Sequence, residues 1–124
     1  MVATVPADLD QRELERYVQR VADRWTLEAA YLGGARVQDL RGAPPQRERG
    51  SEFVAVFVSQ FFDGVPWLER VYQAGALWDA DVMGGPIDVH CYTPAELERK
   101  RGVVGAVGDA VSNGLDLLGG PVSP

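Results

Sequence analysis

Glycine and acidic residues that could together bind a metal and a phosphate occur at separate places in the chain. Gly33 and Gly34 follow a short apolar segment, Glu52 stands immediately before a longer one, and Asp88 lies within a third. Glycine pairs allow a backbone to approach a ligand closely. Clustered carboxylates repel one another unless a divalent cation such as Mg²⁺ neutralises them, and such a cation can orient a triphosphate. We therefore expect a site where the segments carrying Glu52 and Asp88 form neighbouring strands.

Two further kinds of side chain could contribute to this site. His90 follows Asp88 by two residues, so a strand would place both side chains on one face. Arg36 belongs to an irregular segment, 35–51, which also holds Arg41, Arg47 and Arg49. Arginine matches the geometry of phosphate, but a solvated, exposed loop is the simpler interpretation of this segment. Simpler roles are also open for Glu52, as an ordinary residue at the start of a strand, and for Asp88, as a hydrogen-bonded carboxylate at a sheet end. His90 could be a satisfied or half-exposed strand residue, and Cys91 a core residue.

The segment that must position Asp88 is a strand that runs directly into a helix. Ile87–Tyr92 alternates, with apolar residues on one face and Asp88, His90 and Tyr92 on the other. Thr93 is a suitable N-cap, and Glu96, three residues later, completes a capping box. Pro94 fits the first helical position. We therefore expect a strand at 87–92 and a helix at 95–101.

The remaining segments predict a small mixed β-sheet flanked by helices, an α/β (α+β) fold. An amphipathic helix is expected at 11–24, and Phe53–Val58 is apolar throughout, as in a central strand. The segment 27–32 fits a strand or a helix. A further helix should begin at Pro66, and another should run through 103–113 and end at Gly114 as a left-handed cap. An edge strand is expected at 115–118.

Length and charge limit the possible classes of protein. At 124 residues the chain is expected to form a single domain, 1–124, with loose ends at 1–7 and 119–124. A net charge of −6 disfavours a general nucleic-acid surface. No apolar run is long enough to cross a membrane, and the N-terminus does not resemble a signal peptide. The single cysteine excludes an internal disulfide. A cytoplasmic protein is the expectation.

Across most of its length the chain resembles the minimal nucleotidyltransferases of the DNA polymerase beta-like nucleotidyltransferase superfamily. Leu32-Gly33-Gly34 is similar to the opening of their motif, and Ser51-Glu52-Phe53-Val54 stands where an acidic pair is expected. Ile87-Asp88-Val89 matches the strand of the third acid, and the passage into the following helix resembles that of small bacterial members. The resemblance implies a nucleotidyltransferase-like fold, nucleoside triphosphate binding through Gly33, Gly34 and Arg36, Mg²⁺ bound by Glu52 and Asp88, and a catalytic role for Asp88.

The same comparison predicts that the reaction is impaired. Glu52 replaces the usual aspartate, and Val54, which cannot bind a metal, stands at the second acidic position. We expect nucleotidyl transfer to be weak or lost, as in a pseudoenzyme, with residual nucleotide binding; an active enzyme is the other catalytic possibility. The alternative is a non-catalytic interaction module, because small members of this family often pair with a helical partner in toxin–antitoxin modules. Such a module, or a homodimer, could use Trp67 and Trp78 if they are exposed.

Overall fold

The computed structural model describes residues 10–34, 53–100, 110 and 114–118. Its elements are α1 (Gln11–Arg24), β1 (Ala29–Gly33), β2 (Phe53–Val58), the 3-10 turn η1 (Gln60–Phe62), α3 (Trp67–Ala76), α4 (Ala80–Met83), β3 (Ile87–Tyr92), α5 (Pro94–Lys100) and β4 (Leu115–Asp116). The expected loose ends and the arginine-containing segment 35–51 lie outside these residues. The same is true of the expected helix at 103–113, apart from Ala110, which is helical.

The strands form one four-stranded mixed sheet in the order β3-β2-β1-β4. β2 runs parallel to β3, whereas β1 is antiparallel to both β2 and β4. The predicted α/β (α+β) architecture with a small mixed sheet is therefore confirmed. The segment 27–32, which fitted two element types, contributes to strand β1, and β4 is the expected edge strand in a shorter form.

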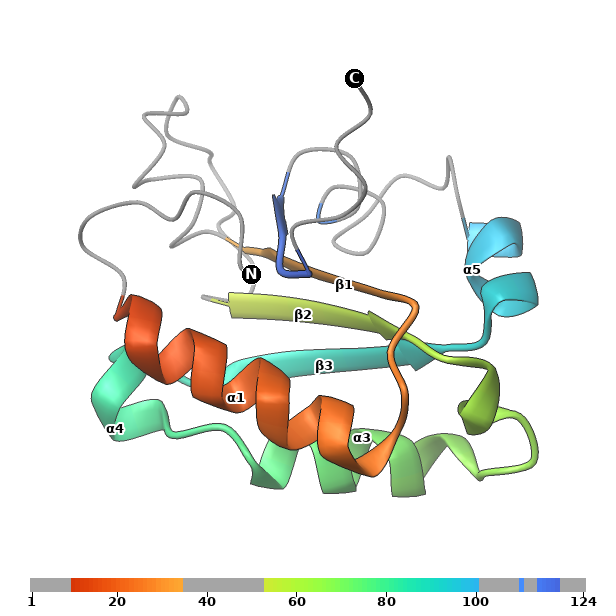
Figure 1. Ribbon diagram of the computed structural model, residues 1–124, viewed down its shortest axis with the longest axis horizontal. Helices are drawn as coiled ribbons and strands as arrows, with labels where there is room; N and C mark the ends of the chain where they lie inside the picture. Colours follow the sequence, from red (N-terminus) through yellow and green to blue (C-terminus); the bar gives the residue numbers. More distant parts are fainter. Residues whose placement is uncertain (1–9, 35–52, 101–109, 111–113, 119–124) are drawn as a thin grey trace.

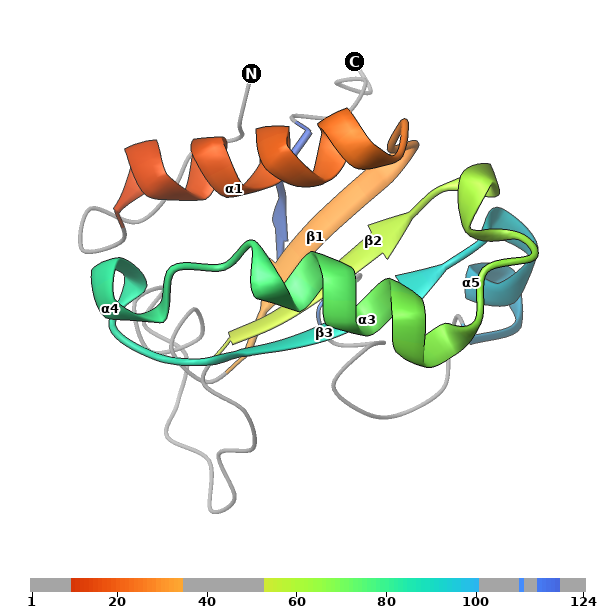
Figure 2. The same ribbon diagram turned by 90° about the horizontal axis from the view of Figure 1, so that it is seen from below.

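Helices α1, α3 and α4 lie on one face of the sheet (Figures 1 and 2). Asp10 begins α1 by accepting a hydrogen bond from the Glu13 backbone N–H at 2.9 Å. The apolar stripe of α1 packs on this face, and the buried Tyr17 hydroxyl donates to the Ala74 carbonyl at 2.9 Å, which joins α1 to α3. The main core comprises buried residues of α1, α3 and alternate strand positions, among them Leu14, Val21, Phe53, Ala55, Phe57, Val89 and Cys91. Cys91 is thus a core residue, as expected.

The opposite face of the sheet has its own smaller core. It contains Val54, Val56, Val58, Tyr92, Leu97 and Ala110. β2 is therefore buried on both faces, as its continuous apolar sequence predicted. Figure 1 shows α5 beside the end of β3. The predicted capping box holds it there, because the Thr93 N–H donates to Glu96 at 2.8 Å and the Glu96 N–H donates to the Thr93 hydroxyl at 3.2 Å.

Two local features differ from the sequence-based expectations. The short helix α4 was not predicted; Asp79 begins it by accepting from the Val82 N–H at 3.1 Å, and Gly84 ends it at a left-handed φ of 83°. Gly114 was predicted to be a left-handed cap, and this is wrong, since its φ is not positive. A Cβ at Gly114 would instead overlap the carbonyl oxygens of Ala110 and Leu32, so close approach of backbones accounts for this glycine.

Among the helices that the structure describes, none has the length and apolar character required to cross a membrane.

Candidate active site

The motif positions of the sequence meet in one row across the sheet. Gly33 of β1 is paired with Val54 of β2, and Val54 is paired with Asp88 of β3. Side chains at paired positions of neighbouring strands point to the same face. The sequence motif therefore corresponds to a physical neighbourhood, with a glycine at one end, an acid at the other and a valine between them.

The central residue of this row, Val54, cannot bind a metal ion. Val54 is only 1% exposed and packs in the smaller core with Val56 and Ala110. Its side chain offers no oxygen ligand, whereas Mg²⁺ takes oxygen ligands and retains several waters. Asp88 thus borders an apolar, buried position where a second carboxylate is expected from the resemblance.

Close packing explains why residue 33, at one end of the row, is a glycine. Gly33 is buried, and a Cβ placed on it would lie 2.9 Å from both Cα and Cβ of Ala110. A side chain at Gly33 would therefore require Ala110 to shift. Gly34 has a φ of 105°, a conformation that favours glycine. Arg36, the third residue predicted to contact a nucleotide, lies outside the described residues.

Asp88, His90 and Tyr92 are polar side chains in contact along β3, on the sheet face that carries the smaller core. Oδ2 of Asp88 lies 3.2 Å from Nε2 of His90, and His90 Nδ1 lies 3.5 Å from the Tyr92 hydroxyl. The side chain of Asp88 is 46% exposed and that of His90 is 23% exposed. His90 is thus the half-exposed strand histidine that was one interpretation of the sequence. The pair brings a carboxylate and an imidazole to the surface in contact, groups that can bind or transfer a proton.

The described residues do not provide a complete metal site. Among them, no group of three or more His, Cys, Asp or Glu side chains could hold a metal ion. Glu52, the other predicted metal ligand, lies outside the part of the chain that the structure describes. Asp88 and His90 therefore supply one carboxylate and one imidazole, which is fewer oxygen ligands than a two-metal centre uses.

A partly buried ion pair between Arg70 and Glu96 was not predicted from the sequence. Arg70 Nη1 donates to Glu96 Oε1 at 2.8 Å and to the Cys91 carbonyl at 3.1 Å, and its Nε donates to the Val65 carbonyl at 2.8 Å. Hydrogen bonding from Arg70, and then from the Thr93 backbone, lowers the pKa of Glu96. The sequence did contain a feature that could have predicted this pair: Arg70 stands among the apolar positions of α3. A buried arginine requires a partner of opposite charge.

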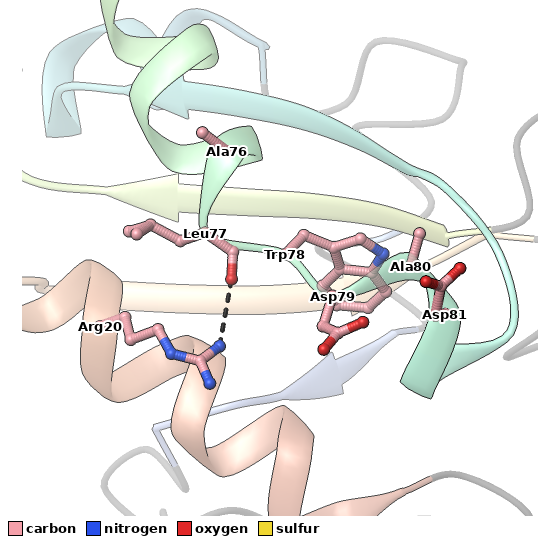
Figure 3. A pocket seen from close by; sticks show the side chains of 7 residues that line it. All are labelled: Arg20, Ala76, Leu77, Trp78, Asp79, Ala80 and Asp81. Atoms are coloured by element: carbon pink, nitrogen blue, oxygen red, sulfur yellow. Dashed lines mark hydrogen bonds between the residues drawn. The ribbon is translucent and has the colours of Figure 1, made fainter.

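A second polar cluster surrounds a hollow between α1 and the α3–α4 connection (Figure 3). This hollow has a volume of about 440 Å³ and is lined by Arg20, Ala76, Leu77, Trp78, Asp79, Ala80 and Asp81. Arg20 is already engaged, since its Nη1 donates to Glu13 at 2.8 Å and to the Leu77 carbonyl at 3.1 Å. Bonding from Arg20 lowers the pKa of the buried Glu13 carboxyl. These contacts join α1 to the end of α3 and serve the fold.

The tryptophans differ in exposure. Trp25 is 8% exposed, whereas Trp67 is 40% exposed. Trp78 packs against the main core, and its indole N–H donates to the Gly85 carbonyl at 2.9 Å. Trp25 and Trp78 therefore belong to the core, and of the two tryptophans predicted to form an interface if exposed, Trp67 exposes more of its ring.

Comparisons with known proteins gave one similarity of structure. No protein-family model matches the chain. No curated protein matches it either. Among solved structures, it is similar to a "putative nucleotidyltransferase" from Sulfolobus solfataricus, with 21% sequence identity, a TM-score of 0.48, and coverage of 72% of this chain and 71% of that chain.

Proposed function

We propose that this chain is a nucleotidyltransferase-fold protein in which nucleotidyl transfer is weak or lost and nucleotide binding persists. The observation that carries the proposal is the row Gly33–Val54–Asp88. The motif resemblance assigns these three positions to one site, and the strand register makes them neighbours. The same row supports the proposed loss of activity, because its central residue is a buried valine.

The roles in this proposal follow from the groups that remain. Asp88, with Glu52 from the sequence motif, would bind a single Mg²⁺, and Asp88 would accept the proton of an attacking hydroxyl in any residual reaction. Gly33 and Gly34 would admit phosphates near the backbone, and Arg36 would pair with them. Loss of the second acid removes the negative charge that holds two metal ions in place. Nucleotide binding is therefore expected to outlast catalysis.

Calorimetric titration with ATP and Mg²⁺ tests the binding claim. We expect heat of binding in the unmodified chain and a weaker response in Asp88→Asn and Arg36→Gln. Arg12→Gln is the matched control, since Arg12 is an exposed arginine on α1. Absence of heat with all four nucleoside triphosphates would refute the claim that nucleotide binding persists.

Restoring the missing acid tests the assignment of the row. Val54→Asp places a carboxylate at a buried position beside Asp88, so we expect a loss of roughly 3 kcal/mol of stability without metal. Mg²⁺ should reverse part of this loss, because it neutralises the two carboxylates. The measurement is thermal unfolding with and without Mg²⁺, and Val54→Asn is the control for burial of a polar group.

In this experiment Mg²⁺ should raise the unfolding temperature of the Asp variant more than that of the Asn variant. Equal responses of the two variants would show that position 54 does not face a metal site. Transfer of label from ATP, assayed in the same Val54→Asp protein, separates a restored enzyme from a restored metal site.

A non-catalytic interaction module is the second candidate, and the exposed apolar residues of α3 favour it. Trp67 is 40% exposed, Leu68 79% and Tyr72 77%, and Phe61 in the preceding turn η1 is 55% exposed. Leu68 and Tyr72 are four residues apart, so they form one stripe along the helix. A helical partner of the toxin–antitoxin type, or a second copy of the chain, would cover this stripe. Co-purification and light scattering test it, and a strictly monomeric chain without a partner would contradict it.

A further inference from the structure

A small hollow lies at the end of β3 away from Asp88. It has a volume of about 190 Å³ and is lined by Trp67, Tyr92, Glu96 and Arg99. Asp88 is the second residue of β3 and Tyr92 is its last. At about 3.3 Å per residue, the two positions are roughly 13 Å apart. The hollow is therefore separate from the row that contains Val54.

The wall of this hollow is aromatic. The Trp67 and Tyr92 rings are 5.3 Å apart between centroids and inclined by 35°. Tyr92 is 7% exposed, whereas Trp67 is 40% exposed. Tyr92 thus supports one side of the indole, and part of the indole remains open. An open, supported aromatic ring is a surface on which a second planar ring can stack.

The charges around the hollow favour an anion. The Glu96 carboxylate is already engaged by Arg70 and by the Thr93 N–H, both at 2.8 Å. Arg99 is exposed on α5 and makes no hydrogen bond or ion pair with the residues that the structure describes. The free charge at the hollow is therefore a guanidinium, which pairs well with phosphate.

We propose that this hollow binds a planar aromatic ring that carries an anionic group, of the chemistry of a nucleoside monophosphate. The ring stacks on Trp67, and the anion pairs with Arg99 at the rim. A cavity of about 150 Å³ can admit benzene, so the volume suits a single ring and leaves the anion outside. This site is independent of the proposed nucleotide binding at Gly33 and Asp88 and does not require Mg²⁺.

The test is a titration of the full chain, without Mg²⁺, with AMP, adenosine and inorganic phosphate. Indole N–H signals in proton–nitrogen correlation spectra report each tryptophan separately, and Trp67 is expected to shift while Trp25 and Trp78 do not. AMP should bind at least fivefold more tightly than adenosine, since adenosine lacks the anion. Absence of a Trp67 shift up to about 10 mM AMP, well above a millimolar dissociation constant, would overturn the proposal.

Matched variants separate the two contacts. Arg99→Gln should weaken AMP at least fivefold and leave adenosine unchanged, whereas Arg12→Gln on α1 should change neither. Trp67→Leu should remove AMP binding, followed through the α5 amide signals, whereas Tyr72→Leu on the same helix should retain it. Binding of inorganic phosphate as tightly as AMP would overturn the role of the ring. Circular dichroism confirms that each variant is folded.

Discussion

At the scale of single residues, Gly33 satisfies a motif and a packing requirement at the same position. Its place in the row with Val54 and Asp88 follows the motif, yet the nearest atoms to its missing side chain belong to Ala110, at 2.9 Å. Glycine at a motif position is therefore weak evidence for phosphate binding taken alone. The two roles can be distinguished by substitution, because loss of the packing role changes the stability of the protein and loss of the binding role changes its affinity for nucleotide.

We predict that Gly33→Ala destabilises the protein by about 1–3 kcal/mol through this overpacking. Gly75→Ala is the matched control, because a Cβ there meets only Val89 Cγ2 at an ordinary 3.9 Å and lies within helix α3. That control should be neutral or stabilising by up to about 1 kcal/mol. Urea unfolding measures both. Unchanged stability in Gly33→Ala would show that Ala110 yields readily and would leave the ligand role as the reason for glycine.

At the scale of elements, the Arg70–Glu96 pair connects α3, β3 and α5. Arg70 is 6% exposed and contacts the Cys91 carbonyl of β3 as well as Glu96 of α5. Glu96 also closes the capping box at the Thr93 N–H. One carboxylate thus caps the start of α5 and attaches the helix to α3, so protonation of Glu96 should weaken both contacts.

We predict that Glu96→Gln lowers stability at neutral pH by roughly 1–2 kcal/mol, because the amide weakens a charge-assisted contact. The folded-state pKa of Glu96 is lowered, so its contribution is complete above the unfolded value of about 4.5 and is lost as pH falls through the folded value. The difference between wild type and variant should therefore shrink from pH 6 to about pH 3.

Unfolding in urea at a series of pH values measures this difference. Glu15→Gln on α1 is the control, since it removes one exposed carboxylate and leaves the Arg70–Glu96 ion pair intact. A difference between wild type and Glu96→Gln that stays constant across the series would contradict the role of the Glu96 charge.

The elements that sequence predicted well are those determined by local pattern. The uniform apolar run of β2, the stripe of α1 and the Thr93 capping box all appear as expected. Strand register and long-range pairs could not be predicted, because they depend on which segments meet in space. Sequence therefore identified Glu96 as a cap and missed Arg70 as its partner. It also could not show that Val54 is buried beside Asp88, although it identified both residues.

At the scale of the whole molecule, one sheet face is covered by helices and the outer side of α3 carries apolar residues into solvent. Leu68 and Tyr72 are the most exposed of the large apolar residues described, at 79% and 77%. Single exposed apolar residues are common, but adjacent ones on one helix face indicate an interaction surface. The hollow at Trp67 and Arg99 is not lined by Leu68 or Tyr72, so substitutions at these two residues separate the proposed partner binding from the proposed ligand binding.

We predict that the double variant Leu68→Ser, Tyr72→Ser keeps its stability within about 0.5 kcal/mol, because these side chains are mainly in solvent. It should lose association with a helical partner or a second copy, measured by light scattering and co-purification. Val82→Ser is the control, since Val82 is 46% exposed on α4, away from the stripe. AMP binding at Trp67 should survive in the double variant. If the double variant still associates, the interface lies elsewhere on the molecule. If the Val82→Ser control also loses association, the effect is a general one of apolar exposure.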